Sequence, residues 1–519
     1  MELGRREFLS AIGAGAVVAC GPSPQPARGP LTQSLLDRVL DAALSAARAS
    51  GASYADVRIH RRQNELVATR DDVLTQVRRG ESFGIGVRVL VSGAWGFAAA
   101  SAVNPEEAAR VAVRAVSIAR ANATLVTKRV ELAKVAAYRA TWSTNLKVDP
   151  FAVPIGERVE LLLSMWRDAR AVPDVKHGDG AIEILGEWKL FASTEGSHIE
   201  QAITRLEPSF GVTAIDTTVG DFVTRQHEIG PRQGGWEWVT GSTFGTDGRK
   251  IAEDARDKLH APTVTPGKRD VILAPSHLWL VIHESIGHST ELDRAMGYEA
   301  DLAGTSFATP DKLGTLMYGG KDLTFYGDKT TPGGLATCGY DDDGEETQRF
   351  DIIKEGRFVA YQTTREQARW VNETRSRGTS YAEDFRSVPF QRMPNVSLAA
   401  GTRELSLDDV VAATDDAILI TGDGSWSIDH QRYNFQFGGQ MFWDVKKGKI
   451  AGPLRDVAYQ SNTLEMWHGC DLLGGPGSWS LHGAIHDGKG EPGQSNAVSH
   501  GCPPARFRQV NVINTKAST

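Results

Sequence analysis

The chain has 519 residues, of which 41% are hydrophobic and 23% are charged, so a sizeable core can form. This length predicts two domains, with three as the alternative, rather than one. The formal net charge of -7 argues against nucleic acid or an anionic membrane surface as the main partner. The four cysteines match no zinc ribbon or Cys-x-x-Cys redox motif, so a disulfide framework is not expected.

Residues 1–30 have the features of an export signal followed by a tether. Arg5 and Arg6 stand before an apolar run over residues 11–19, an order that resembles a twin-arginine export signal. The run is too short for a permanent membrane span and fits a cleavable signal. Cys20 ends a stretch that resembles a bacterial lipobox, in which this cysteine would be lipidated and would tether the protein. These features predict a periplasmic protein or one on the outer face of the cytoplasmic membrane; the alternative is a soluble protein with a chance basic start.

The N-terminal domain, residues 31–266, is predicted to be α+β. Helices are expected over residues 31–49, 104–121, 155–171 and 248–259, and strands over 54–60, 67–77, 83–91 and much of 181–226. Asn104 and Pro105 form a strong helix start, because Asn caps the first turn and Pro suits its first position.

The C-terminal domain, residues 267–519, is predicted to be mostly antiparallel β with one buried helix. A short strand is expected over residues 270–273, a helix over 277–291, and later strands over 417–421 and 510–513. The acidic run over residues 341–346 lacks the spacing of an EF-hand and is expected to be a solvated turn.

His283, Glu284 and His288 form a His-Glu-x-x-x-His pattern near the middle of the chain. Imidazoles are common zinc ligands, and a carboxylate supplies an acid–base group. Taken alone, the pattern leaves open that these are core or helix-end histidines and that Glu284 is a solvated acid. The flanking residues are apolar on more than one side of the expected helix, which indicates burial. Two buried histidines and a glutamate need partners, and a metal supplies them.

The five-residue spacing of His283 and His288 does not suit a regular helix. Four residues turn about 400° and share one face, whereas five turn about 500° and leave two side chains about 140° apart. A regular helix would therefore keep the two imidazoles from sharing one ion. Gly287 stands just before the second histidine, so we expect the helix to bend, bulge or end there and His288 to lie on a distorted turn.

These residues predict a zinc-dependent peptidase. Zinc polarises a substrate carbonyl and lowers the pKa of a bound water, and Glu284 would take the proton of that water and pass it to the leaving amine. A catalytic zinc usually has a third protein ligand in addition to residues such as His283 and His288.

Several short motifs along the chain resemble the TldD/PmbA family of metallopeptidases. They lie at residues 54–57, 84–88, 96–98, 283–288, 392–395, 438–440 and 488–490, so the resemblance covers most of the chain after the signal. It implies a two-domain fold, a zinc held by both histidines, a glutamate general base, and hydrolysis of peptides or unfolded segments inside a dimer chamber. PmbA-like members lack the His-Glu-x-x-x-His motif. Its presence indicates the TldD-like, catalytic branch, as a homodimer or as a heterodimer with a PmbA-like subunit.

The third metal ligand is where this chain departs from the family, which has a cysteine just before a Gly-Lys pair near the C-terminus. Asp487 takes that position here, directly before Gly488 and Lys489. Position favours Asp487, ligand chemistry favours the adjacent His486, and Cys502 is a third candidate. A carboxylate ligand would increase tolerance for manganese or iron in place of Zn²⁺. If the third ligand and the metal have been lost, the chain is instead a non-catalytic scaffold or maturation subunit of an exported complex.

Overall fold

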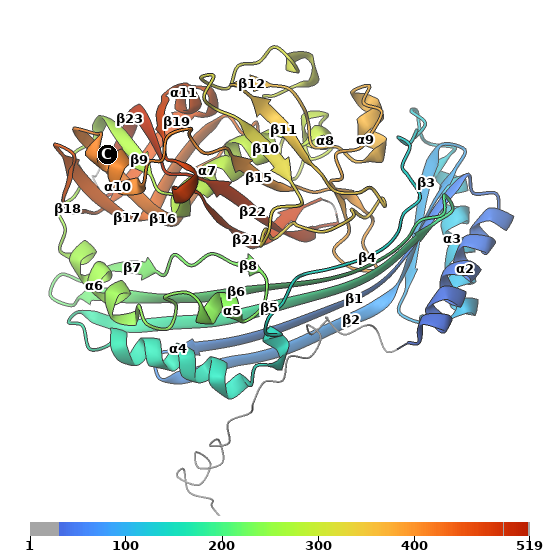
Figure 1. The fold of residues 1–519 in the computed structure, drawn as a ribbon, viewed down its shortest axis with the longest axis horizontal. Coiled ribbons are helices and arrows are strands. Elements are labelled where there is room, and N and C mark those ends of the chain that lie inside the picture. Colours follow the sequence, from blue (N-terminus) through green and yellow to red (C-terminus); the bar gives the residue numbers. More distant parts are fainter. Residues whose placement is uncertain (1–30, 491, 517–519) are drawn as a thin grey trace, which may run out of the picture.

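The computed structural model describes residues 31–490 and 492–516, so the predicted export signal and Cys20 lie outside the described residues. An N-terminal sheet with helices is followed by a C-terminal unit rich in β-strands (Figure 1). Among the described helices, none combines the length and the apolar character needed to cross a bilayer. The α+β class expected from the sequence is confirmed.

The N-terminal unit is built on one eight-stranded sheet. Its elements are α2 (Gln33–Ala49), β1 (Tyr54–Arg70), β2 (Val73–Val91), β3 (Ala94–Ala100), α3 (Pro105–Asn122), β4 (Arg139–Ser143), η1 (Pro150–Ala152), α4 (Ile155–Ala169), β5 (Val175–Ser193), β6 (His198–Asp216), β7 (Asp221–Gln226), β8 (Arg232–Gln233), α5 (Glu237–Thr240) and α6 (Gly248–Leu259). The strand order is β3-β2-β1-β5-β6-β4, and β7 and β8 also pair with β6.

The two faces of this sheet differ in chemistry because side chains alternate along each strand. On β1, Ala55, Val57 and Ile59 pack into the apolar core formed with α2 and α3. The intervening residues Asp56 and Arg58 are buried polar residues, and Arg58 donates a hydrogen bond to a backbone carbonyl at residue 387 of the C-terminal unit. The long strands β1, β2, β5 and β6 therefore run beneath the C-terminal unit, with α4 on their opposite side (Figure 1).

Most expected elements of the N-terminal unit are present, but the strand expected over residues 67–77 is wrong. β1 ends at Arg70, the chain turns at Asp71 and Asp72, and β2 begins at Val73. Asp71 has φ 53°, a left-handed conformation that Asp tolerates better than most residues. The start of α3 is as expected, because the Asn104 side chain accepts a hydrogen bond from the third residue of the helix.

The C-terminal unit contains smaller sheets and short helices. Its elements are β9 (Gly267–Leu273), α7 (Pro275–Ile282), η2 (His283–Gly287), η3 (His288–Thr290), α8 (Leu292–Ala295), η4 (Pro310–Lys312), β10 (Phe325–Asp328), β11 (Arg349–Lys354), β12 (Arg357–Phe358), α9 (Arg365–Trp370), β13 (Ser380–Tyr381), β14 (Phe390–Gln391), β15 (Asn395–Leu398), α10 (Leu407–Ala412), β16 (Asp416–Ile428), β17 (Asn434–Lys446), β18 (Lys449–Leu454), β19 (Val457–Asn462), α11 (Thr463–His468), β20 (Cys470–Leu473), η5 (Pro476–Ser478), β21 (Ser480–Lys489), β22 (Gln494–Cys502) and β23 (Ala505–Asn514).

Five strands of this unit close into a barrel. β16, β9, β23, β19 and β17 pair in that order, and β17 pairs back with β16. The pairing of β16 with β9 is parallel, and the other pairings around the ring are antiparallel. Val281, Ile282 and Ile286 share one apolar core with barrel residues such as Phe437 and Phe507. The helix that carries the histidines is therefore buried, as the sequence predicts.

The acidic run over residues 341–346 is not the solvated turn expected from the sequence. Asp341, Asp342 and Asp343 are all buried where the C-terminal unit meets the N-terminal sheet. Asp343 accepts a hydrogen bond from Arg88 at 2.7 Å, and Asp342 accepts one from Lys189 at 2.9 Å. The expectation failed because cations on distant strands pair with Asp342 and Asp343, which no local spacing shows.

Candidate metal centre

The helix carrying the two histidines changes its winding at the motif. α7 is α-helical as far as Ile282, η2 is a π-turn, and η3 is a 3₁₀ turn that begins at His288. The backbone N–H of His288 donates to the carbonyl of His283, five residues earlier. This wider turn brings residues five apart onto one side, and the two imidazole centroids lie 4.5 Å apart. The prediction that His288 lies on a distorted turn is confirmed, although the distortion begins at His283 rather than at Gly287.

Gly287 allows the π-turn to pack closely against its surroundings. A Cβ atom at this position would lie 2.5 Å from the Met393 sulfur and 3.7 Å from the imidazole of His500. Any larger residue would push the turn away from Met393, which lies between β14 and β15, and from His500 on β22. Glycine is required here for close approach, since its backbone angle is an ordinary helical one.

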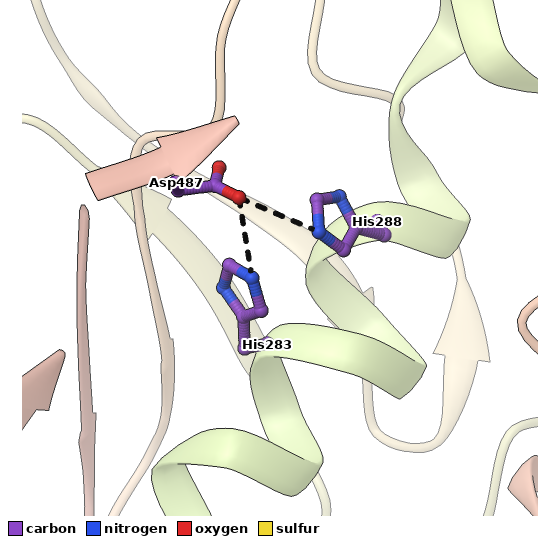
Figure 2. A group of neighbouring side chains, drawn as sticks. All are labelled: His283, His288 and Asp487. Carbon is purple, nitrogen blue, oxygen red and sulfur yellow. Dashed lines mark ion pairs between the residues drawn. The ribbon is translucent and has the colours of Figure 1, made fainter. Parts of the chain in front are cut away.

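Asp487 on β21 meets the two histidines and completes a compact group (Figure 2). One ligand atom from each of the three residues lies within 4.8 Å of the others. His283 Nε2 and His288 Nε2 lie 3.6 Å and 3.8 Å from Asp487 Oδ1. A bulge in the pairing of β21 with β22 falls between Ala484 and Asp487, and such irregularities re-aim side chains near functional sites.

The group fits a divalent transition metal. Ligand atoms about 2.0–2.2 Å from one zinc ion in tetrahedral geometry lie roughly 3.3–3.6 Å from each other. The observed separations of 3.6 and 3.8 Å are close to that range and too long for good hydrogen bonds. Two imidazole nitrogens and one carboxylate oxygen also form a known donor set for zinc and for other divalent ions.

The ring of His288 is held by a buried carboxylate on its far side. His288 Nδ1–H donates to Glu291 Oε2 at 3.0 Å, which leaves Nε2 directed at Asp487. Glu291 is in turn paired with Arg294 at 2.9 Å and with Lys489 at 3.2 Å. Burial acts to raise the pKa of Glu291, but Lys489 and Arg294 hold this pKa well below its usual range. An ionised Glu291 therefore fixes the tautomer that a metal-binding histidine requires.

The ring of His283 is held by a chain of two hydrogen bonds. His500 Nδ1–H donates to the Val396 carbonyl at 2.7 Å, which leaves His500 Nε2 as an acceptor. His283 Nδ1–H donates to that acceptor at 2.9 Å. Burial lowers the pKa of His500 well below its usual value, so the ring remains neutral. His500 thus leaves Nε2 of His283 as the atom that faces Asp487.

Asp487 is held from behind by a buried guanidinium. Arg392 donates to Asp487 Oδ2 at 3.0 Å and to the Gln494 carbonyl at 3.0 Å, and it also contacts the Asp487 carbonyl. Oδ1 is the oxygen nearer to the histidines. Although burial acts to raise the pKa of Asp487, the two histidines and Arg392 hold it well below its usual range.

Protons and metal compete for the two imidazoles. Burial acts to lower the pKa of His283, but the facing carboxylates of Asp487 and Glu284 outweigh burial and raise it. Burial lowers the pKa of His288 to about 4, with Glu291 opposing this shift. His283 is therefore the ligand at which a proton competes most strongly with a metal.

Glu284 lies beside this group and forms an ion pair with Arg432. Arg432 Nη1 donates to Glu284 Oε2 at 2.6 Å. Arg432 has φ 63°, an unfavourable backbone angle for Arg, in a turn between β16 and β17 that the Asp429 carboxylate pins through backbone N–H groups. This turn holds one oxygen of Glu284, and no described residue donates a hydrogen bond to the other.

His486 and Cys502, the alternative third ligands, are not part of the group. The His486 side chain is 50% exposed and lies on the other side of β21, where its Nε2 is 3.0 Å from Glu183 Oε2. Its neighbour Asp487 faces the histidines because successive residues of a strand point to opposite faces. Cys502 is fully buried, with its sulfur 3.8 Å from the Pro275 carbonyl, and burial raises the pKa of its thiol.

Sequence reasoning missed the residues that support the group. Glu291 stands three residues after His288, a spacing that brings side chains together on a helical turn and could have suggested it. His500, Arg392 and Arg432 lie far from the motif in sequence. Arg392 opens the family motif at residues 392–395, which by itself assigns it no role, and nothing local distinguishes His500 or Arg432 from ordinary core or surface residues.

The donor group and its adjacent glutamate define the chain as a protein with a candidate mononuclear metal centre. Two family profiles agree with that class. The PmbA/TldA metallopeptidase C-terminal domain matches residues 266–514, and PmbA/TldA metallopeptidase domain 1 matches residues 55–119. Together they span more than half of the chain, which therefore belongs to the TldD/PmbA family of metallopeptidases.

Curated relatives extend this similarity over most of the chain. A metalloprotease of Methanocaldococcus jannaschii is 25% identical over 429 residues, which cover 81% of this chain and 89% of that protein. A metalloprotease of Methanothermobacter thermautotrophicus is 26% identical and covers 89% of this chain and 96% of its own length. A TldD homolog of Haemophilus influenzae is 22% identical, with 89% and 93% covered.

Solved structures share the fold. A Thermotoga maritima protein described as a modulator of a DNA gyrase superposes with a TM-score of 0.71 at 15% identity, covering 92% of this chain and 100% of that one. TldE from Thermococcus kodakarensis gives a TM-score of 0.68 at 15% identity, with 91% and 99% covered. At this level of identity the likeness concerns the fold alone.

Proposed function

We propose that the chain is a metal-dependent peptidase of the TldD-like, catalytic branch of its family. His283, His288 and Asp487 would hold one divalent ion, with zinc as the expected metal and another transition metal as the alternative. The observation that carries this proposal is the convergence of three buried ligand atoms within 4.8 Å beside Glu284. The metalloprotease names of the relatives support the same reaction class.

The residues around the group have distinct roles in the proposed reaction. A bound divalent ion would supply Lewis acidity towards a substrate carbonyl and would acidify a coordinated water. Glu284 accepts the proton of the attacking water and delivers it to the leaving amine. Arg432 holds Glu284 through Oε2, so the carboxylate keeps one oxygen for proton transfer. Glu291 and His500 keep both imidazole Nε2 atoms facing Asp487, where they would hold the ion.

Peptide hydrolysis by the full-length chain tests the proposal. The protein is purified, loaded with zinc, and assayed on a mixture of short peptides and on unfolded casein, with Glu284→Gln as the matched control. We expect the variant to retain its metal and to lose roughly a thousandfold in kcat, since a positioned acid–base group contributes about 10²–10⁴. Equal peptide turnover by the parent and Glu284→Gln would contradict the proposal.

Metal analysis separates the peptidase from a non-catalytic scaffold or maturation subunit. An intact three-ligand site retains its ion through careful purification. We expect close to one zinc or similar ion per chain, lost in His283→Ala. A content below about 0.1 per chain would favour the scaffold.

We also propose that the chain is exported by a twin-arginine signal and is tethered through Cys20. Partners of the proposed enzyme are a peptide or unfolded protein and a second copy or a PmbA-like subunit. Replacing Arg5 and Arg6 together with Lys should trap the protein in the cytoplasm. Cys20→Ser should release it from membranes without blocking export. Normal export of the double-Lys variant would contradict the signal.

A further inference from the structure

Arg232 on β8 differs from the other deeply placed arginines in having no carboxylate partner among the described residues. Arg158 pairs with Glu65 at 2.7 Å and Arg205 pairs with Glu187 at 2.6 Å. Arg232 has only a long contact of 3.5 Å to a backbone carbonyl at residue 481, and its Nε is buried without a hydrogen bond. Burial lowers the pKa of Arg232 to about 10, with no acidic neighbour opposing the shift. A desolvated guanidinium with unused donors is costly unless it serves a ligand.

Trp238 on α5 holds this guanidinium in place. The Arg232 guanidinium carbon lies 4.1 Å from the centre of the Trp238 ring, within the range of a cation–π contact. Trp238 itself is fixed, because its indole N–H donates to the Gly230 carbonyl at 3.1 Å. Stacking on an aromatic face orients a guanidinium without using its N–H donors. Those donors therefore remain available to a second group.

The available space is a cavity of about 490 Å³ between the N-terminal unit and the start of β21. Its lining includes Arg232, Trp238, Ser242, Thr243, Ser480 and His482. Burial lowers the pKa of His482 to about 4, so this ring adds no charge near neutral pH. The volume suits a terminal amino-acid residue or a short acidic side chain, since drug-sized ligand sites begin near 300 Å³.

Each acidic residue of the cavity wall has a partner other than Arg232. Glu228 lies 2.8 Å from Arg225. Asp254 lies 3.5 Å from Lys250. Asp247 faces His227 at 3.4 Å. Arg232 is therefore the cation of the wall that has no carboxylate partner among the described residues.

We propose that Arg232 and Trp238 form a binding site for a carboxylate, supplied by a peptide C-terminus or by an acidic side chain. A planar carboxylate matches the paired N–H donors of a guanidinium, and the hydroxyl groups of the wall can supply further hydrogen bonds. Ser480 in this cavity and Asp487 in the metal centre are seven positions apart on β21, roughly 23 Å of extended strand. The site is thus separate from the metal centre and does not depend on the proposed peptidase activity.

Calorimetric titration of the full-length chain tests this site. The probes are N-acetyl-trialanine with a free carboxylate, its C-terminal amide, and an N-acetylated, C-terminally amidated tripeptide with a central aspartate. We expect binding of the free acid, the aspartate peptide or both, and none of the trialanine amide. Arg232→Gln should weaken this binding about tenfold or more, as expected for a charge-assisted hydrogen bond.

Three variants keep the test decisive. Lys250→Gln removes an already paired cation of the same wall and should change the affinity less than twofold. Arg232→Lys keeps the charge without the planar donors, should bind more weakly than the parent, and serves if Arg232→Gln does not fold. His283→Ala should leave carboxylate binding unchanged, which separates this site from the metal centre. Equal binding of the acid and the amide, no binding of either carboxylate probe, or full affinity in Arg232→Gln would overturn the proposal.

Discussion

Two buried groups of ionisable residues in this molecule differ in the distances between their facing side-chain atoms. Where the acidic run meets the N-terminal sheet, Asp343 lies 2.7 Å from Arg88 and Asp342 lies 2.9 Å from Lys189. In the metal centre, His283 and His288 lie 3.6 and 3.8 Å from Asp487. The first set has hydrogen-bond distances, and the second has the distances of ligands around one ion.

The difference shows how a binding group can be told from a structural one when both are buried. At the interface, each carboxylate of the pairs above is matched by a cation, so the group stabilises the contact between the two units. In the metal centre, the neutral His500, the carboxylate of Glu291 and the guanidinium of Arg392 stand behind the three ligands and orient their free ligand atoms towards one another. Orientation by outer partners, rather than burial, marks the functional group.

The largest effect is expected from a substitution that breaks the buried ion pairs of Arg88 and leaves the metal centre intact. Arg88→Met leaves Asp56 and Asp343 buried without their shared guanidinium, which should lower the free energy of unfolding by about 3–5 kcal/mol. Urea denaturation measures this free energy, and His283→Ala is the matching substitution in the metal centre. That variant should lose its metal and, compared without metal, change the unfolding free energy by only about 1 kcal/mol. Equal destabilisation by both would remove the distinction between the groups.

The next effect concerns a fully hydrogen-bonded imidazole outside the metal group. His277 bonds the Gly422 carbonyl and the Tyr459 hydroxyl, and burial lowers its pKa to about 4. Because the unfolded chain gains a proton near pH 6.5 and the folded chain does not, stability is present above pH 6.5 and is lost as pH falls towards 4. The shift predicts a loss of about 3 kcal/mol. Urea denaturation of the metal-free chain across this range, compared with His277→Gln, measures it; an equal pH dependence in both would contradict the prediction.

A smaller effect tests the residues that direct the ligands. His500→Phe keeps a ring of similar size but removes the acceptor for His283, and Glu291→Gln removes the charge behind His288. Each should weaken metal binding roughly 10–100-fold, as substitutions behind metal ligands do. Competition titration with a chromogenic chelator measures the affinity. Unchanged affinity in both variants would mean that the ligands are oriented without these partners.

The smallest effect is expected for an exposed ion pair, which gives the reference value for the buried pairs. Arg170 and Asp72 lie 2.7 Å apart but are 47% and 62% exposed. Arg170→Ala should change the free energy of unfolding by less than about 1 kcal/mol, because solvent and salt screen such pairs. Thermal denaturation measures it, and a loss as large as that of Arg88→Met would show that burial does not set the strength of these pairs.

The sequence predicted the parts of the fold and site whose signals are local. The cap at Asn104 and the distorted turn at His288 follow from residue types within a few positions of each other. The position before Gly488 and Lys489, compared with the family pattern, favoured Asp487, whereas ligand chemistry favoured His486; the structure brings Asp487 to the two histidines.

The remaining features depend on contacts between distant segments. The acidic run could not be recognised as buried, because its partners Arg88 and Lys189 lie on strands more than 150 positions away. His500 could not be connected with His283, which is 217 positions away. The turn at Asp71 and Asp72 was a local signal that the apolar residues around it obscured.

A crystal structure of the zinc-loaded protein, with anomalous data at the zinc edge, tests the central claim most directly. The predicted result is one anomalous peak bonded by His283 Nε2, His288 Nε2 and Asp487 Oδ1 at about 2.0–2.2 Å. No peak between these residues after loading, or a peak bonded by His486 or Cys502 instead of Asp487, would contradict it.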